Sequence, residues 1–265
     1  MAKNKIYFGK SENIPYTTFK NKLRYFLRRF ANMLYSKVFS NDMEAEFNKI
    51  YEDSKNYTMT SKERMYALYK STQYIINSKI PGDFVECGVW KGGSAMIMAL
   101  SLLKMNETKR KIYLYDTFKG MTKPTEKDIR TLDSAPIINI WRKYQKKNHN
   151  KWYFSCIGEV KKNMLSTGYP LEKLIFVRGK VEDTIPNTMP SKIAILRLDT
   201  DWYESTYHEL KYLFPLISCG GVIIIDDYGN FAGQKEAVNK YFKKNNIKIL
   251  LNRIDYSCRL GIKMK

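Results

Sequence analysis

Four aspartates end two apolar segments of this sequence and could act together chemically. Asp199 and Asp201 end the first segment, and Asp226 and Asp227 end the second. Both segments are rich in β-branched residues, a pattern typical of strands buried inside a parallel sheet. Ligands of open α/β sheets bind beyond the carboxyl ends of such strands. If the two strands are neighbours, they direct four carboxylates into one crevice.

Carboxylates held that close together repel one another unless a cation or protons neutralise them. A hard divalent cation with oxygen ligands, most simply Mg²⁺, explains the cluster. Arg197, at a buried strand position, is expected to pair with a nearby carboxylate and to orient the metal ligands. The alternative is that the aspartates cap helices or are solvated in loops. Their repetition on two strands favours the metal.

A glycine-rich turn follows the first predicted strand, 83–87. Glu86 lies near the end of the strand, Gly88 begins the turn, and Ser94 lies at the start of the next helix. Gly88 allows a tight turn and a close ligand, and Ser94 can form a hydrogen bond at the helix start. The spacing Glu-x-Gly-x-x-x-Gly differs from the Gly-x-Gly-x-x-Gly of dinucleotide-binding folds. A carboxylate here suits a cation, and S-adenosylmethionine (SAM) carries a sulfonium and an ammonium group.

Two later turns fit the remaining parts of SAM. Asp116 ends the second predicted strand, where a carboxylate can accept hydrogen bonds from both ribose hydroxyls. Gly179 follows the third predicted strand, and Glu182 or Asp183 would lie near the adenine amino group. The alternative is three ordinary strand–helix turns, but their order on successive strands favours a SAM site.

Strands and helices alternate from residue 83 onward, which predicts a doubly wound α/β fold with right-handed crossovers. The predicted strands form a mostly parallel, seven-stranded sheet from residues 83–87, 111–116, 173–178, 192–198, 221–226, 247–251 and 258–263. The predicted helices are 42–54, 60–79, 93–105, about 151–166, 203–215 and 232–245. The segment 117–150 has no clear strand and is expected to form a lid or a substrate wall.

The composition favours a cytoplasmic protein. Hydrophobic residues make up 44% of the chain, which is enough for a packed core. The sequence contains no run of about 18 apolar residues, so no membrane-spanning helix is predicted. The start of the chain lacks the apolar core of a signal peptide. The four cysteines are scattered without a Cys-x-x-Cys motif, as in reduced proteins. The two histidines, His149 and His208, are too few for a His-rich zinc site.

The net charge of +20 fits several partners: nucleic acid, an anionic membrane surface or an acidic substrate. It also fits a Lys-rich surface that has no partner. The first 40 residues hold nine Lys or Arg and one acid, Glu12. Apolar residues recur there at helical spacing, so residues 17–39 predict a basic amphipathic helix. We expect it either to contact an anionic membrane or a partner, or to pack on its own domain or a second subunit.

Five motifs of the chain together resemble the macrocin-type O-methyltransferases, which are SAM- and Mg-dependent enzymes that methylate sugar hydroxyls. The motifs lie at residues 57–64, 81–94, 115–121, 196–206 and 220–229, and the resemblance covers about residues 56–250. It implies a Rossmann-like methyltransferase sheet with an N-terminal helical cap. We accordingly expect a helical extension over residues 1–55, a SAM-dependent domain over residues 56–265, and a homo-oligomer.

The resemblance also implies roles for the four aspartates. It implies that Asp199, Asp226 and Asp227 are ligands of Mg²⁺ and that Asp201 is the general base for the sugar hydroxyl. Asp199 is expected to contact the cofactor as well as the metal.

The resemblance also implies that Glu86, Asp116 and residues 179–183, from the three turns, lie around SAM. It adds Thr58 and Met59, which would close over the cofactor.

Other classes of function fit parts of the sequence. The positive charge fits a nucleic-acid methyltransferase, but the chain has neither an RNA-binding signature nor the Asn-Pro-Pro-Tyr motif used on exocyclic amines. A SAM-type fold could also be a non-catalytic module that binds partners through the N-terminal helix. The complete set of four aspartates argues against that module, and the glycine pattern argues against an NAD-dependent oxidoreductase.

Overall fold

The computed structural model describes residues 42–264 together with Leu23, Leu27, Phe30 and Ala31. The basic helix predicted for residues 17–39 therefore lies almost entirely outside the described residues. Leu23, Leu27 and Phe30, three positions of its predicted apolar face, are helical and 46–53% exposed. The contact of this helix with an anionic membrane stays a prediction. Within the described part of the chain, no helix is both long and apolar enough to cross a membrane.

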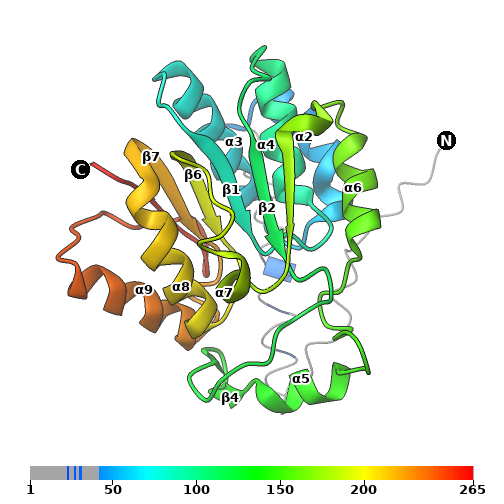
Figure 1. Ribbon diagram of the computed structural model, residues 1–265, viewed down its shortest axis with the longest axis vertical. Coiled ribbons are helices and arrows are strands. Elements are labelled where there is room, and N and C mark those ends of the chain that lie inside the picture. Colours follow the sequence, from blue (N-terminus) through cyan, green and yellow to red (C-terminus); the bar gives the residue numbers. More distant parts are fainter. Residues whose placement is uncertain (1–22, 24–26, 28–29, 32–41, 265) are drawn as a thin grey trace.

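A seven-stranded sheet forms the centre of the molecule, with the strand order β5-β2-β1-β6-β7-β9-β8 (Figure 1). The strands are β1 (Asp83–Cys87), β2 (Ile112–Asp116), β5 (Leu174–Arg178), β6 (Ile193–Leu198), β7 (Ile217–Ile225), β8 (Asn252–Arg253) and β9 (Arg259–Ile262). In this order, the five neighbouring strands β5, β2, β1, β6 and β7 pair in parallel, whereas β9 is antiparallel to both β7 and β8. The predicted α/β class and the mostly parallel seven-stranded sheet are confirmed.

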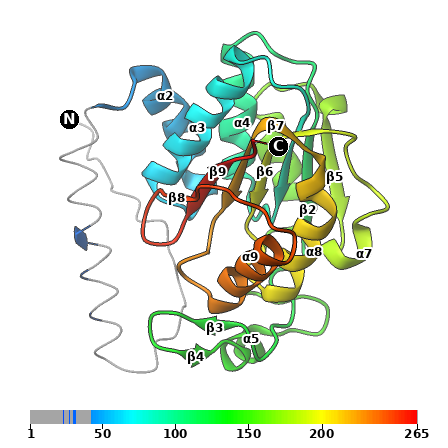
Figure 2. The same cartoon turned by 90° about the vertical axis from the view of Figure 1, so that its left-hand side faces the viewer.

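Helices cover both faces of the sheet, as the doubly wound prediction requires (Figure 1 and Figure 2). One face carries α2 (Ala45–Ser54), α3 (Lys62–Asn77), α4 (Gly93–Lys104) and α6 (Ile157–Leu165), and the other carries α7 (Val181–Thr184), α8 (Tyr203–Leu213) and α9 (Ala232–Lys244). Short 3-10 helices lie at η2 (Lys55–Tyr57), η3 (Leu171–Lys173) and η4 (Phe214–Leu216). Alternate strand residues face opposite layers, so Phe84 packs with the first group and Val85 with the second.

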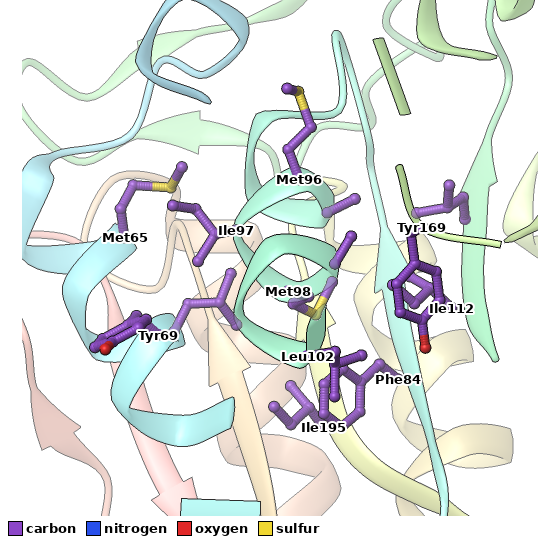
Figure 3. Packing of buried hydrophobic residues seen from close by; sticks show 14 of the residues in the cluster. Met65, Tyr69, Phe84, Met96, Ile97, Met98, Leu102, Ile112, Tyr169 and Ile195 are labelled. Carbon is purple, nitrogen blue, oxygen red and sulfur yellow. The ribbon is translucent and has the colours of Figure 1, made fainter. Parts of the chain in front are cut away.

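Helix α4 is buried along most of its length, because α3 covers the side that faces away from the sheet. Nine of its 12 residues are buried. Figure 3 shows the packed side chains Met65, Tyr69, Phe84, Met96, Ile97, Met98, Leu102, Ile112, Tyr169 and Ile195. Phe47 and Ile50 of α2 lie in the same cluster, so the end of the predicted 1–55 extension contributes to this core. The boundary at residue 55 stays a prediction.

Two predicted elements differ from the structure. The helix predicted around 151–166 begins only at Ile157, because Tyr153 has a φ of 52° and the N–H of Trp152 binds the Asn150 side chain instead of a helical carbonyl. The prediction of a strand at residues 247–251 is wrong. The N–H of Ile247 binds the Phe242 carbonyl at the end of α9, so this residue is not part of a strand. Pairing of β8 with β9 begins at residue 252.

The segment 117–150, predicted to hold no clear strand, contains short elements. They are β3 (Ile129–Arg130), β4 (Ala135–Pro136) and α5 (Ile138–Tyr144). Figure 2 shows these elements at one end of the sheet. The Trp202 indole N–H donates to the Thr122 carbonyl, and the Tyr203 N–H donates to Asp128. These bonds fix the segment against the start of α8, directly after the carboxyl end of β6.

Candidate active site

The predicted aspartates of β6 and β7 meet at the carboxyl ends of the two strands, because these strands are parallel neighbours. The N–H of Asp226 binds the Leu198 carbonyl at 3.0 Å, and the N–H of Asp199 binds the Cys87 carbonyl at 2.8 Å. Carboxylate oxygens of Asp199, Asp226 and Asp227 all lie within 4.8 Å of one another. This set offers a hard cation three oxygen ligands.

Arg197 pairs with nearby carboxylates, as predicted, and it also connects the cluster to Glu86 of β1. Its Nη1 lies 2.7 Å from Glu86 Oε1 and 2.8 Å from Asp199 Oδ2, and its Nη2 lies 2.7 Å from Asp226 Oδ1. The guanidinium is 3% exposed. A planar group with several donors can hold three carboxylates in fixed directions, so Arg197 sets the orientation of two of the metal-ligand candidates.

Arg64 of α3 is a second arginine of the site, and its role was not predicted. Its Nη1 lies 2.5 Å from Asp226 Oδ2, and its Nε lies 2.7 Å from Asp255 Oδ2. Ser61, the N-cap of α3, also donates to Asp255 at 3.0 Å. In the sequence, Arg64 directly precedes Met65 and lies one helical turn before Leu68, and both of these residues are buried. A charged residue next to buried positions was the sequence pattern that could have indicated a role for Arg64. Asp226 is thus held between two arginines from different elements.

Asp201 lies beside Asp227 in a buried and strained position. Its backbone is in the left-handed region with a φ of 69°, and the residue is 4% exposed. Burial raises the pKa of Asp201 well above its usual range, and a hydrogen bond shared with the Asp227 carboxylate raises it further. Burial likewise raises the pKa of Asp199, against the opposing effect of Arg197. Protons or a cation must therefore balance this cluster.

Glu86, predicted to face the cationic part of SAM, has one paired and one unpaired oxygen. Oε1 accepts from Arg197, whereas Oε2 is buried without a hydrogen-bond partner in the described structure. Burial raises the pKa of Glu86 to about 7, although Arg197 opposes the shift. A buried acceptor without a partner is costly. The ammonium group of bound SAM is a donor of the type that would satisfy it.

The glycine turn after β1 has the close approach that the sequence predicted. Gly88 has a φ of 86°, and a Cβ there would lie 2.1 Å from the Asp199 carbonyl oxygen. Ser94 is 5% exposed, and its hydroxyl contacts the Met65 sulfur at 3.8 Å. Gly88 therefore brings the turn directly against the Asp199 backbone.

Residues Thr58 and Met59, predicted to close over the cofactor, lie near the start of α4. A Cβ on Gly93 would lie 2.7 Å from Thr58 Cβ, so the chain crosses the N-terminus of this helix. The Thr58 hydroxyl bonds to the Thr60 hydroxyl at 3.0 Å, and Met59 is 45% exposed. Their contact with the cofactor stays a prediction.

Asp116 supports the turn that follows β1. Its Oδ2 accepts from the N–H groups of Val89 at 2.8 Å and Trp90 at 3.1 Å, and its Oδ1 accepts from the Phe118 N–H at 2.7 Å. Burial raises the pKa of Asp116, and these three hydrogen bonds oppose the shift. Each carboxylate oxygen has two lone pairs. The three N–H groups use both lone pairs of Oδ2 and one of Oδ1, and the Thr117 hydroxyl lies 3.5 Å from Oδ1. The predicted acceptance from both ribose hydroxyls stays a prediction.

The third predicted turn lies beside Asp116. The Gly179 N–H binds the Asp116 carbonyl at 3.0 Å, which joins the ends of β5 and β2. Glu182 and Asp183 are exposed on α7 and line a cavity of about 240 Å³ that also includes Trp202. The structure thus brings the three predicted turns to the same edge of the sheet as the aspartates.

One family model matches nearly the whole chain. A family model described as macrocin-O-methyltransferase (TylF) matches residues 3–260 of the chain. The chain belongs to the macrocin O-methyltransferase family. The match begins at residue 3, whereas the motifs in the sequence covered only about residues 56–250, so the basic N-terminal segment also has a counterpart in the family.

Individual relatives in this family are O-methyltransferases. The chain is 32% identical over 199 residues to the 8-demethyl-8-(2,3-dimethoxy-alpha-L-rhamnosyl)-tetracenomycin-C 4'-O-methyltransferase of Streptomyces olivaceus, covering 75% of this chain and 72% of that protein. It is 30% identical over 200 residues to the mycinamicin III 3''-O-methyltransferase of Micromonospora griseorubida, covering 75% of each. The solved structure of the O-methyltransferase NovP covers 92% of this chain and 100% of that chain, with a TM-score of 0.70 and 26% identity. The chain is therefore a SAM-dependent O-methyltransferase.

Proposed function

We propose that this enzyme methylates a hydroxyl group of a sugar, with Mg²⁺ held by Asp199, Asp226 and Asp227 and with Asp201 as the general base. The observation that carries the proposal is the approach of three carboxylates within 4.8 Å beside the buried Asp201. The relatives from Streptomyces olivaceus and Micromonospora griseorubida are named for methylation of glycosylated natural products. This supports a sugar as the acceptor.

The chain's own residues would bind, orient and deprotonate the acceptor. A sugar hydroxyl is almost fully protonated at neutral pH and is a weak nucleophile. When bound, SAM supplies the electrophilic methyl group, and Mg²⁺ supplies positive charge that makes the hydroxyl more acidic. Asp201 lies beside Asp227 and would accept the hydroxyl proton on a carboxylate oxygen. The lid segment 117–150, fixed to the start of α8 by Trp202 and Tyr203, would help to exclude water.

The proposed cofactor residues contact different parts of SAM. Glu86, with its unpaired Oε2, would accept from the ammonium group of SAM. Gly88 and Ser94 would form the turn around it, Asp116 would accept from the ribose, and Gly179 with Glu182 or Asp183 would border the adenine. Asp199, Thr58 and Met59 complete the proposed cofactor contacts.

The test is calorimetric titration of the protein with Mg²⁺ and, separately, with S-adenosylhomocysteine (SAH). We expect Mg²⁺ binding by the wild type that Asp227→Asn weakens at least ten-fold while SAH binding stays within about two-fold. Glu236→Gln, an exposed acid of α9, is the control for a general loss of negative charge. Equal Mg²⁺ binding by wild type and Asp227→Asn would remove the metal site from the proposal, and absence of SAH binding would remove the cofactor assignment.

We further propose a cytoplasmic location and a homo-oligomer. All four cysteines are free in the structure, with Cys87 and Cys258 buried and Cys156 and Cys219 exposed, which suits a reducing compartment. Light scattering of the purified full-length protein measures the oligomeric state directly. Co-sedimentation with anionic vesicles tests whether residues 17–39 contact a membrane surface.

A further inference from the structure

A pocket of about 770 Å³ opens between the 117–150 segment and the turn after β5. Its volume lies within the range of small-molecule binding sites. Thr117, Met121 and Trp141 line one side, and Arg178 and Gly179 line the other. None of these residues belongs to the aspartate cluster, and only Gly179 belongs to the proposed cofactor site.

The charge of this pocket is positive throughout. Its cationic lining residues are Lys119, Lys123, Lys147, Arg178 and Lys180. No described lining residue is an acid, and none of the five cations forms an ion pair with a described carboxylate. By contrast, the neighbouring Lys127 pairs with Glu236 and Arg130 pairs with Asp133. Five like charges around one pocket repel one another, and an anionic ligand would relieve that repulsion.

The wall of this basic pocket is held in place by partly buried hydrogen bonds. The Trp141 indole N–H donates to the Met121 carbonyl at 2.9 Å, and the Asn150 amide donates to the Trp141 carbonyl at 2.9 Å. Asn150 is 2% exposed. Gly120 packs so tightly that a Cβ there would lie 2.0 Å from the Asn150 carbonyl oxygen. The pocket is thus a formed part of the fold rather than a chance gap between surface lysines.

SAM does not account for this charge. It carries a sulfonium, an ammonium and one carboxylate, so its net charge is positive, and its adenosine part is neutral. The basic pocket borders the proposed adenine side of the cofactor site through residues 178–180. A ligand that pairs with five cations there must be a different, anionic group.

A smaller cavity adjoins the basic pocket. The smaller cavity of about 240 Å³ shares Thr122, Lys123 and Lys180 with it. Its other lining residues include Trp202 and four acids, Asp128, Glu182, Asp183 and Glu204. Trp202 directly follows Asp201 in the chain. One acceptor molecule could therefore place an anionic group among the lysines and an uncharged sugar in the smaller cavity beside Trp202.

We propose that the basic pocket binds a diphosphate group of the acceptor, so that the sugar is methylated while it is attached to a diphosphate carrier. This inference rests on the proposed sugar O-methyltransferase function. A diphosphate offers several oxygens to lysine and arginine donors, and such charge-assisted hydrogen bonds are among the strongest that proteins form. The diphosphate would anchor the acceptor, while residues near the aspartates select the hydroxyl.

The test is titration of the full-length, SAH-saturated protein with inorganic pyrophosphate. We expect saturable binding that the double variant Lys123→Glu/Lys147→Glu weakens roughly ten-fold or more. The matched control is Lys104→Glu/Lys244→Glu, which changes the net charge equally at exposed positions of α4 and α9. SAH affinity, measured on both variants, verifies that each is folded with an intact cofactor site.

Three outcomes would overturn the inference. The first is the absence of pyrophosphate binding. The second is equal weakening by both double variants, which would show attraction to the overall charge alone. The third is pyrophosphate binding only to SAH-free protein, which would place the anion in the cofactor's own site. Because these titrations need no methyl transfer, a failure to find sugar methylation would count against the proposed function and leave the pyrophosphate result standing.

Two soluble probes distinguish the carriers. Tighter binding of UDP-glucose than of pyrophosphate supports a nucleotide carrier, and tighter binding of farnesyl diphosphate supports a lipid carrier. The Lys123→Glu/Lys147→Glu variant should weaken the tighter probe as well. Failure of both probes to bind would overturn the assignment to a diphosphate-linked sugar.

Discussion

Arg64 Nη1 lies 2.5 Å from Asp226 Oδ2, although the two residues are 162 positions apart in the chain. Arg197 holds the other oxygen of the same carboxylate at 2.7 Å. Asp226 is 2% exposed, so neither water nor other charges can replace these partners readily. The two arginines therefore make a buried carboxylate tolerable in the fold and fix its direction toward Asp199 and Asp227.

Arg64→Met is expected to lower the free energy of unfolding by about 3–5 kcal/mol, because Asp255 loses its arginine partner and the buried Asp226 keeps only Arg197. Denaturant unfolding followed by circular dichroism measures the change. Arg142→Met, at an exposed position of α5, is the control and should change stability by less than about 0.5 kcal/mol. A similar, small effect of both substitutions would show that Arg64 does not stabilise the cluster.

Asp201→Asn is expected to reduce kcat about 10²–10⁴-fold, because asparagine keeps the size of the side chain but cannot accept the hydroxyl proton. Formation of SAH from SAM with a panel of monosaccharide glycosides measures the activity. Mg²⁺ and SAH affinities should change little, which separates lost chemistry from lost binding. Near-normal kcat in the variant would require another base.

Glu86→Gln should change how stability depends on pH. The carboxyl titrates near 4.5 when unfolded and at about 7 in the fold. Between these values the folded protein keeps a proton that the unfolded chain has lost, so wild-type stability decreases as the pH rises through this window. Between pH 4.5 and pH 7, this titration lowers the free energy of unfolding of the wild type by an amount on the order of 3 kcal/mol.

Glutamine does not titrate, so the free energy of unfolding of Glu86→Gln minus that of the wild type should increase from pH 4.5 to 7 and stay constant above. Urea unfolding at a series of pH values measures this difference. Glu172→Gln, an exposed position in η3, provides the control. A difference that is independent of pH would contradict the raised pKa of Glu86.

Gly88→Ala is expected to destabilise the fold by at least about 2 kcal/mol and to weaken SAH binding. The φ of 86° is unfavourable for alanine, and its Cβ would lie 2.1 Å from the Asp199 carbonyl oxygen. Gly158→Ala in α6, where no atom lies within 4 Å of the added Cβ, should instead stabilise the protein by about 0.5–1 kcal/mol. Thermal unfolding of the two variants compares them directly, and equal melting temperatures would refute the packing argument.

Local patterns were sufficient to predict the main strands and helices that position the site. The apolar segments ending at Asp199 and Asp226 became β6 and β7, because buried parallel strands require continuous apolar residues. Predictions failed where one local hydrogen bond decided the outcome. At residues 151–156, the Asn150 side chain and the backbone of Tyr153 delay the helix, and hydrophobic spacing does not record such bonds.

The sequence by itself determined the α/β fold class, the four aspartates and their place at strand ends, because these depend on residue type and short-range spacing. Only the tertiary structure decided which groups surround them. Arg64 reaches Asp226 and Asp255 across 162 and 191 positions of the chain, and five cations from the lid segment and the β5 turn converge on one pocket. These partners arise from the packing of distant segments, for which local spacing in the sequence carries no signal.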